Sequence, residues 1–209
     1  MIGLIDYGMG NLHSVAKALE VSGGAVTIVR EPERLKNFER LVLPGVGAFR
    51  DCIGTLKERG LDEALLERIE AGVPYLGICL GMQVLMEASL EFGHYQGLGL
   101  IPGQVRPFPE SHPERGFKIP HMGWNDVVLP SGRDPHPVLA SLGRRQVYFV
   151  HSYVCMPQHE NHILAATSYG DYPFASAIGR DNIIGVQFHP EKSQAAGLGL
   201  LEAFIQWKP

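Results

Sequence analysis

The stretch from Tyr75 to Leu85 constrains the fold of this chain more than any other. It begins as a short apolar segment and changes character at Cys79, which predicts a buried strand that turns there into a helix. Gly77 and Gly81 stand two residues to either side of the thiol. We expect a side chain at either glycine to collide with the opposite limb of the turn. Such a cramped strand-to-helix turn is typical of a site that presents a nucleophile.

The predicted turn places Cys79 at the amino end of a helix, where unpaired amide groups and the helix dipole favour a thiolate. A lone internal cysteine is more often a small packing residue. The flanking glycines favour a nucleophile instead. A nucleophilic thiol needs a base and an oxyanion site, so the rest of the sequence has to supply both.

The first half of the chain alternates apolar segments with helical patterns. Strands are predicted at residues 2–6, 25–29, 41–43 and 75–79, and helical spacing follows at residues 12–19 and 61–69. Asn11 is placed to cap the first of these helices. Strands this apolar have no polar face that could be exposed to water. We therefore expect an α/β fold with a central, mostly parallel sheet covered by helices on both sides.

The second half is richer in strand patterns. Mostly antiparallel strands are predicted at residues 103–108, 123–129, 146–153, 163–168, 174–178 and 183–188. Residues 179–182 predict a hairpin turn, residues 107–113 a surface loop, and the apolar spacing after residue 197 a closing helix. No repeat or linker divides the sequence, so we expect one domain over residues 1–209.

Composition excludes several functional classes. The 209 residues are 45% hydrophobic and 19% charged, which is enough for one sizeable core. A formal net charge of −4 disfavours nucleic acid as the main partner, and no apolar run reaches the roughly 18 residues of a membrane span. Three cysteines without a CxxC pattern and a start without a signal-peptide pattern favour the cytoplasm.

His189 is the strongest candidate for the base. An apolar strand delivers it to its end, and Glu191 lies two residues further on, on the same side of an extended backbone. A carboxylate there can bind one ring nitrogen, fix the tautomer and leave the other nitrogen for a thiol. Alone, His-Pro-Glu fits a solvated turn better. Together with the Cys79 turn, it favours a catalytic triad.

The oxyanion site has two candidate sources. The amide of Leu80 follows the nucleophile directly. The turn after the neighbouring predicted strand contains Gly45, Val46 and Gly47, and its glycines allow a peptide to direct its N–H inward. A plain strand-to-helix turn would need only about one glycine. We therefore expect Val46, Gly47 and Leu80 to form the oxyanion hole.

Two other kinds of site fit the sequence poorly. Gly8-x-Gly10 and Gly45-x-Gly47 follow predicted strands, but neither has the third glycine of a dinucleotide site. His159 and His162 are too closely spaced to bind zinc from one helical face. We expect neither a metal nor a cofactor.

The catalytic residues carry a family resemblance. The segment from Gly77 to Gln83, GICLGMQ, with His189 and Glu191 far downstream, resembles the class I (triad) glutamine amidotransferases. Further stretches are similar to the glutaminase subunits of imidazole glycerol phosphate synthases: DYGMGN at 6–11, KIPHMGWN at 118–125 and YFVHSY at 148–153. The resemblance covers the whole chain. It implies a flavodoxin-like three-layer sandwich.

The resemblance also implies the chemistry. Cys79 would attack the side-chain amide of glutamine, His189 would move the protons, and Glu191 would orient His189. It implies that Val46 and Gly47 belong to a movable oxyanion segment. The implied substrate-binding residues are Gln83, Glu91, His151, Ser152 and Tyr153.

The ammonia would pass to a partner. The resemblance implies a cyclase subunit with a (β/α)8 barrel, which would make imidazole glycerol phosphate and aminoimidazole carboxamide ribotide in histidine biosynthesis. For the docking face we expect the residues Met9, Asn11, Met122, Trp124 and Asn125. Trp124 could equally be a core residue of its strand.

Three other functions remain compatible with these residues. The chain could be a glutaminase subunit of another pathway, or a cysteine hydrolase of γ-glutamyl substrates or peptides that acts without a partner. It could also be an interaction subunit without catalysis, although the intact Cys79, His189 and Glu191 argue against this.

Overall fold

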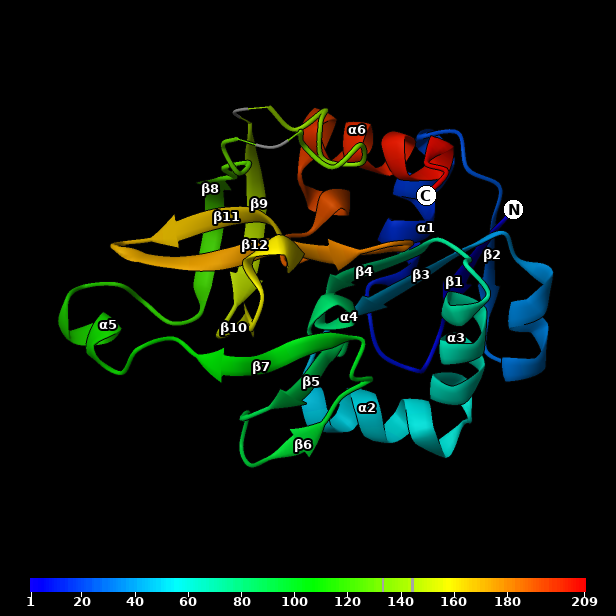
Figure 1. Ribbon diagram of the computed structural model, residues 1–209, viewed down its shortest axis with the longest axis horizontal. Coiled ribbons are helices and arrows are strands. Elements are labelled where there is room, and N and C mark those ends of the chain that lie inside the picture. Colours follow the sequence, from blue (N-terminus) through cyan, green and yellow to red (C-terminus); the bar gives the residue numbers. More distant parts are fainter. Residues whose placement is uncertain (133, 144) are drawn as a thin grey trace.

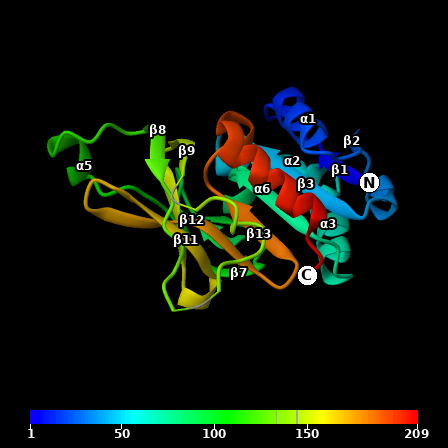
Figure 2. The same ribbon diagram turned by 90° about the horizontal axis from the view of Figure 1, so that it is seen from above.

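Five parallel strands form the half of the sheet that carries the predicted nucleophile. The computed structural model describes residues 1–132, 134–143 and 145–209. In it the parallel strands lie in the order β2-β1-β3-β4-β13 (Figures 1 and 2). Their bounds are β1 Ile2–Ile5, β2 Val26–Val29, β3 Arg40–Gly45, β4 Tyr75–Cys79 and β13 Ile183–Val186.

Alternating side chains of these strands face two separate hydrophobic clusters. Leu4 belongs to the cluster that contains buried residues of α1 (Leu12–Val21) and α6 (Gln194–Gln206), whereas its neighbour Ile5 belongs to the other. The second cluster contains buried residues of α2 (Phe49–Glu58) and α3 (Leu61–Glu70). The helices therefore cover both faces, as predicted (Figure 2).

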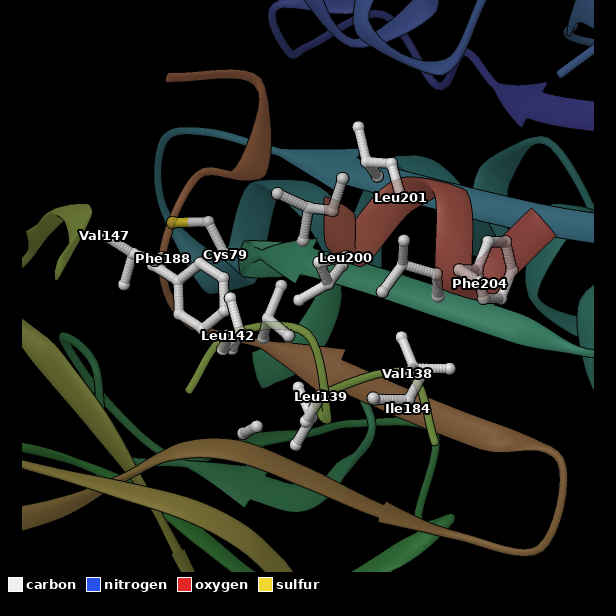
Figure 3. Close-up of a cluster of buried hydrophobic side chains, with 14 of the residues drawn as sticks. Cys79, Val138, Leu139, Leu142, Val147, Ile184, Phe188, Leu200, Leu201 and Phe204 are labelled. Atoms are coloured by element: carbon white, nitrogen blue, oxygen red, sulfur yellow. The ribbon is translucent and has the colours of Figure 1, made fainter. Parts of the chain in front are cut away.

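The cluster beneath α6 extends to the end of β4. Leu200 and Phe204 of α6 pack in it with Ile184 of β13. Cys79 and Phe188 lie at its edge (Figure 3). Both helices and strands therefore support the position of the thiol.

Mostly antiparallel strands extend the same sheet beyond β13, although β5 pairs with β7 in parallel. The order continues β12-β10-β7-β5-β6, with β11 also paired to β12, while β8 and β9 form a separate ribbon. The bounds are β5 Met86–Ser89, β6 Tyr95–Gln96, β7 Ile101–Pro107, β8 His121–Asp126, β9 Gln146–His151, β10 Tyr153–Pro157, β11 Ile163–Tyr169 and β12 Tyr172–Arg180. The predicted mixture of parallel and antiparallel strands is confirmed. In the part of the chain that is described, no helix has the length and apolarity to cross a membrane.

The remaining helical segments are short. They are α4 (Leu80–Gln83), α5 (Ser111–Glu114) and the 3-10 turns Pro32–Asn37, Glu160–His162 and Pro190–Lys192. The helix predicted after Cys79 is thus only one turn long. The chain leaves it after Val84 to enter β5, so the helix dipole at the thiol is that of a single turn.

Several local predictions differ from the structure. The strand expected at 146–153 is interrupted at Ser152, because β9 pairs with β8 and β10 pairs with β7. Helix α2 was not predicted, and α5 begins inside the expected loop at 107–113 and ends just beyond it. Asn11 occupies the N-cap position of α1, but its side chain makes no capping hydrogen bond. The predicted hairpin is present, with Arg180 paired to Ile183.

Gly77 and Gly81, the two glycines of the Cys79 turn, lie in close contact with the main chain of other residues. A Cβ added to Gly77 would overlap the carbonyl of Gly81, on the opposite limb as expected. At Gly81 the expectation was wrong in its detail, because an added Cβ would overlap the carbonyl of Leu43 on the neighbouring strand β3. Cys79 itself has a φ of 54°, in the left-handed region that non-glycine residues rarely occupy.

We expect Gly81→Ala to destabilise the protein by at least about 3 kcal/mol, the upper range for overpacking, because a strand carbonyl cannot rotate away from the new methyl group. Urea unfolding measures the change. Gly54→Ala is the matched control, because Gly54 lies within α2 with no atom within 4 Å of an added Cβ. That variant should gain about 0.5–1 kcal/mol. Equal stability of the two variants would contradict the backbone contact.

Candidate active site

The register of three parallel strands brings the predicted site residues to one edge. Gly45 at the end of β3 pairs with Cys79 at the end of β4. On the other side of β4, Val186 pairs with Ile78. The carboxyl ends of parallel strands are where open α/β sheets bind ligands. The chain following β13 therefore continues alongside the thiol.

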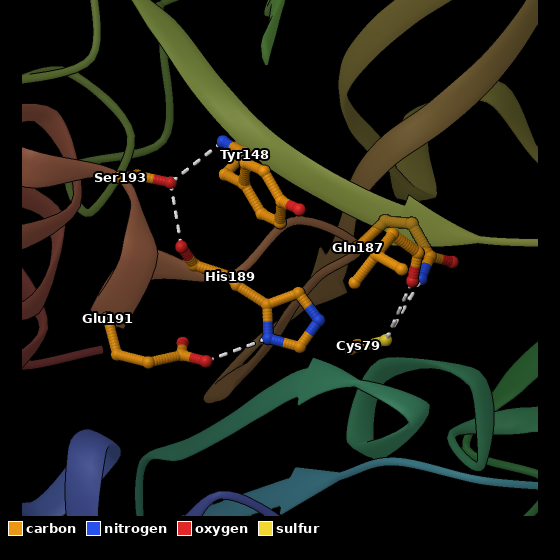
Figure 4. Close-up of polar contacts among 7 residues, drawn as sticks. Cys79, Tyr148, Gln187, His189, Glu191 and Ser193 are labelled. Carbon is orange, nitrogen blue, oxygen red and sulfur yellow. Dashed lines mark hydrogen bonds and ion pairs between the residues drawn. The ribbon is translucent and has the colours of Figure 1, made fainter. Parts of the chain in front are cut away.

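Backbone contacts fix the position of His189 after β13. Its amide N–H donates to the carbonyl of Tyr148 on β9, at 2.9 Å. The Ser193 hydroxyl donates to the His189 carbonyl at 2.7 Å and accepts from the Tyr148 amide at 3.0 Å (Figure 4). The backbone of His189 is therefore held by Ser193 on one side and by strand β9 on the other.

The imidazole of His189 lies between Glu191 and Cys79. Its Nδ1 is 2.8 Å from Oε1 of Glu191, and both side chains are almost fully buried. Its Nε2 is buried, has no hydrogen-bond partner among the described residues and faces the Cys79 sulfur (Figure 4). Burial lowers the pKa of His189, but the adjacent thiol and the Glu191 carboxylate outweigh it and raise the pKa above its ordinary value. The arrangement fits a triad in which Glu191 fixes the ring.

A residue that the sequence interpretation gave no role contacts the thiol directly. The side-chain amide of Gln187 donates from Nε2 to the Cys79 sulfur, at 3.6 Å. Gln187 is fully buried and also accepts a hydrogen bond from Gln83, at 3.0 Å. The segment Gln187-Phe188-His189 follows β13, so Gln187 and His189 approach the sulfur from one segment, while the carbonyl of Val150 on β9 lies 4.0 Å from it.

A cavity of about 520 Å³ opens beside Cys79. It brings together the predicted site residues Val46, Gly47, Cys79, Leu80, Gln83, Glu91, His151, Ser152, Tyr153 and His189. Glu191 lies behind His189 and does not line it. The sequence interpretation missed three lining residues, Phe92, Pro120 and Val150. None of these carries a reactive group that could have marked it.

The predicted oxyanion segment lies at the edge of the cavity. Gly47 has a φ of 96°, so its backbone uses the freedom of glycine. The backbone N–H of Val46 approaches the buried hydroxyl of Tyr7 without completing a hydrogen bond. Burial raises the pKa of Tyr7, and this amide acts in the opposite direction. The Val46 amide therefore lies close to the Tyr7 hydroxyl.

Glu91 is held at the cavity by the start of a helix. Its Oε2 accepts a hydrogen bond from the amide of Phe49, the first residue of α2, at 2.6 Å. Burial raises the pKa of Glu91, and the Phe49 amide partly opposes this. The contact occupies one carboxylate oxygen and leaves the other for a ligand.

Protein partners occupy the polar groups of two predicted substrate-binding residues. Nε2 of Gln83 donates to the carbonyl of Tyr153, at 3.2 Å, and to Gln187. This leaves the Gln83 carbonyl oxygen for a ligand. Both ring nitrogens of His151 contact protein, one at the Tyr153 carbonyl and one at His121. The His151 ring therefore shapes the cavity without a free nitrogen for glutamine.

The five residues expected at a docking face are accessible to different degrees. Met122 is 61% and Trp124 44% exposed, so Trp124 is not a core residue. Asn11 is exposed and Met9 half-buried, and the Met9 sulfur lies 3.8 Å from where a Cβ at Gly47 would be. Asn125 is half-buried. Their role at an interface stays a prediction.

Nothing in the described ranges resembles a metal centre. Among residues 1–132, 134–143 and 145–209, no three His, Cys, Asp or Glu side chains converge as metal ligands.

A comparison with known families identifies the family to which this fold belongs. The model of the family described as glutamine amidotransferase class-I matches residues 3–206. Solved structures agree in fold: a crystal structure of a glutamine amidotransferase has a TM-score of 0.74 at 20% identity, with 97% of this chain and 98% of the other covered. The structure of PurLQS from Thermotoga maritima has a TM-score of 0.73 at 16% identity, with 98% and 95% covered. The chain belongs to the class I glutamine amidotransferases.

Relatives of similar length show which group within the class I glutamine amidotransferases this chain resembles. A protein of Geobacter sulfurreducens is 49% identical over 99% of both chains, and one of Salinibacter ruber is 50% identical over 98% of this chain and 93% of the relative. Both are named imidazole glycerol phosphate synthase subunit HisH. Within the class I amidotransferases, it is this group of synthase subunits that the chain resembles over its whole length.

We expect Glu191→Gln to lower the pKa of His189, because the variant removes a carboxylate that favours the imidazolium. An NMR titration of the His189 ring protons measures the pKa. Glu202→Gln, at an exposed position of α6, should leave it unchanged. An unchanged His189 pKa in Glu191→Gln would contradict the pairing.

The same pair determines a pH dependence of stability. Because folding raises the pKa of His189, the pair stabilises the fold fully below the pKa of an unfolded histidine, ~6.5. The contribution is lost as the pH rises through the folded value of about 10. The difference in free energy of unfolding between the wild type and Glu191→Gln should therefore shrink as the pH rises from the folded-state pKa of His189 in the variant to about 10 in the wild type.

Proposed function

We propose that the protein hydrolyses L-glutamine to glutamate and ammonia through Cys79, His189 and Glu191. The observation that carries the proposal is the buried imidazole of His189, which contacts Glu191 on one side and faces the thiol on the other. A class I amidotransferase fold and a cavity of small-molecule size support it. Residues 1–209 would act as one glutaminase domain.

Each residue of the triad has a defined task in this mechanism. His189 holds the proton of the thiol as an imidazolium, and the Cys79 thiolate attacks the side-chain carbonyl carbon of glutamine. The imidazolium then donates its proton to the leaving ammonia, and a glutamyl thioester remains. Water attacks the thioester with His189 as base, which releases glutamate and restores the thiol. Glu191 stabilises the imidazolium in both halves of the reaction.

The cavity offers complementary groups for glutamine. The free oxygen of Glu91 would bind the substrate ammonium group, and the free carbonyl oxygen of Gln83 would accept from its side-chain amide. Ser152 and Tyr153, at the break between β9 and β10, would contact the remainder of the substrate. The amides of Val46 and Leu80 would bind the developing oxyanion.

The ammonia would serve a second subunit. Relatives of nearly equal length are named as subunits of imidazole glycerol phosphate synthase. We propose a cytoplasmic heterodimer with a (β/α)8-barrel cyclase, a lyase that uses the ammonia to form imidazole glycerol phosphate and aminoimidazole carboxamide ribotide in histidine biosynthesis. Its docking face would include Met9, Asn11, Met122, Trp124 and Asn125. The exposed apolar side chains of Met122 and Trp124 support this choice.

The oxyanion segment, which contains Val46 and Gly47, would control the glutaminase activity. In the resting chain the Val46 amide would face away from the cavity, and the glycine conformation of Gly47, with its φ of 96°, would allow this peptide to turn. Met9, a docking residue in this proposal, contacts the region of Gly47. A partner bound there would favour a conformation in which the Val46 amide faces the cavity.

We expect Cys79→Ala to abolish glutamine-dependent synthesis by the complex, because the variant lacks the nucleophile, while added ammonium still supports the cyclase. Product formation with each nitrogen source measures both activities. Cys155→Ala, at a buried cysteine outside the cavity, should keep both. Survival of glutamine-dependent synthesis in Cys79→Ala would exclude this residue as the nucleophile.

We also expect the purified chain alone to hydrolyse glutamine at least about a hundredfold more slowly than the complex with bound cyclase substrate, because one lost oxyanion donor costs a factor of this order. Co-purification with the cyclase, followed by a glutaminase assay with and without the nucleotide substrate, measures this. Full turnover by the chain alone would contradict a resting inactive segment. Labelling of Cys79 by a glutamine-analogue electrophile such as diazo-oxo-norleucine separates an enzyme from a non-catalytic subunit.

A further inference from the structure

The sulfur of Cys79 lies among groups that favour different protonation states. Nε2 of Gln187 is 3.6 Å from it, and the imidazole of His189 faces it (Figure 4). The carbonyl of Val150, on β9, lies 4.0 Å away. A thiol can donate to that carbonyl, whereas a thiolate can only accept and depends on the two nitrogens. The state of the sulfur therefore depends on how firmly the two donors are held.

The helix that follows Cys79 gives a thiolate little support. Helix α4 is a single turn, so its dipole is small. The Cys79 side chain is only 8% exposed and lies at the edge of an apolar cluster. Removal from water destabilises an anion unless hydrogen-bond donors replace the lost hydration. A hydrogen bond to an ionised acceptor is roughly twice as strong as one between neutral groups. A fixed donor at the sulfur therefore favours the thiolate over the thiol.

Two neighbouring groups determine which atom of Gln187 faces the sulfur. The carbonyl of Tyr153 can only accept, so the Gln83 atom 3.2 Å from it is the amide nitrogen. The same nitrogen lies 3.0 Å from the Gln187 side chain, which must present its oxygen there. Rotation of the Gln187 amide by 180° would place two NH₂ groups together. The Gln187 nitrogen is therefore the atom that contacts the sulfur.

The main chain of Gln187 is held as firmly as its side chain. The residue is fully buried, and its backbone N–H donates to the carbonyl of Ser176 on β12, at 2.9 Å. The preceding residue, Val186, pairs with Ile78 immediately before the nucleophile. The amide thus reaches the sulfur from a segment fixed between β12 and β4. Such a donor needs no rearrangement when negative charge develops.

We propose that Gln187 is a further catalytic residue: its side-chain amide, oriented by Gln83, donates to the Cys79 thiolate in both halves of the reaction. The inference rests on the proposed glutaminase function and deepens it. In the first half the donor keeps the sulfur as a thiolate. In the second half water attacks the thioester and gives a proton to His189. The carbon–sulfur bond then breaks, and its electron pair returns to the sulfur, where the Gln187 amide stabilises the charge.

The other titratable groups around the sulfur differ in charge but are common to the wild type and the variants below. Burial lowers the pKa of His189, but the thiol and its carboxylate partner outweigh this and raise the pKa to about 10. Burial raises the pKa of Tyr7 and of Cys155 and lowers that of His151 to about 3, so these three groups are neutral at ordinary pH. Burial also raises the pKa of Glu91, which lines the same cavity.

Two substitutions separate the donor from the packing around it. Gln187→Met keeps a side chain of similar length but removes the amide. Ser176→Ala is the matched control, because Ser176 is buried beside Gln187 and its hydroxyl has no hydrogen-bond partner among the described residues. Urea unfolding verifies that both variants are folded.

Alkylation by iodoacetamide over a series of pH values measures the thiolate on the purified chain, without substrate or partner. Mass spectrometry of the modified peptide identifies Cys79 as the site. Burial raises the pKa of Cys52 to about 12 and that of Cys155 as well, and neither residue lines the cavity. The reagent therefore reports on Cys79.

In Gln187→Met we expect the midpoint of the alkylation curve to rise by about one pH unit. On its acid side the rate should fall about tenfold, the lower range for a hydrogen bond to a charged group. The curves should meet at high pH, where the thiolate is complete in both proteins, and Ser176→Ala should follow the wild type. In the complex with the synthase partner, breakdown of the glutamyl thioester should slow about tenfold in Gln187→Met, because the departing sulfur loses a donor. Acid-quenched single turnovers measure this step.

NMR of the wild type provides a test that needs no variant. The Gln187 amide proton that binds the sulfur should move downfield along the same pH curve as the alkylation rate. The protons of the Gln83 amide, which bind oxygens, should move much less.

Several results would overturn the inference. These are equal alkylation curves for the wild type and Gln187→Met, an unchanged rate of thioester breakdown, and a Gln187 amide proton that does not follow the titration of the thiol. An equal displacement of the curve in Ser176→Ala would assign the effect to packing. A wild-type complex that does not hydrolyse glutamine would instead overturn the proposed function, and the alkylation curves would still decide whether Gln187 stabilises the thiolate.

Discussion

The close approach of backbone to backbone at Gly77 and Gly81 is the constraint on which the site depends. Gly81 lets the turn after Cys79 rest on the carbonyl of Leu43, so β3 and β4 end side by side. Gly77 lets the two limbs of that turn meet. Because the nucleophile and the oxyanion segment follow these two strands, their separation is set by hydrogen bonds and contacts of the main chain, which side-chain motion cannot relax.

The parallel half of the fold could be predicted because each of its strands and turns has a recognisable local sequence pattern. Strands buried on both faces are continuously apolar, and turns rich in glycine separate them from helices. Helix α2 could not be predicted with the same ease, because it begins directly after the glycine turn and contains Gly54, which weakens a helical pattern. The break at Ser152 was not predicted because it arises where β9 and β10 pair with different strands. The sequence of a strand does not show which distant strand it pairs with.

The reactive residues could be predicted, whereas their supporting contacts could not. Cys79 and His189 stand in short motifs whose chemistry limits the choice of residue. Gln187 lies inside such a motif, yet its bond to the sulfur depends on the register of β13 against β4. His151 was predicted to contact the substrate and it does line the cavity, but the partners of its ring nitrogens, which come from two other segments, could not be predicted. Sequence patterns therefore predict reactive side chains better than they predict the hydrogen-bond partners of these side chains.

The position of β13 beside β4 has a consequence for how the protein folds. The two strands are neighbours in the sheet, yet the whole antiparallel half of the chain lies between them in sequence. Their pairing closes a very long loop, whose entropy has to be offset by contacts formed elsewhere first. The nucleophile and its base therefore meet late in folding, and a nascent chain that has not yet added its last strand holds an exposed strand edge and no assembled triad.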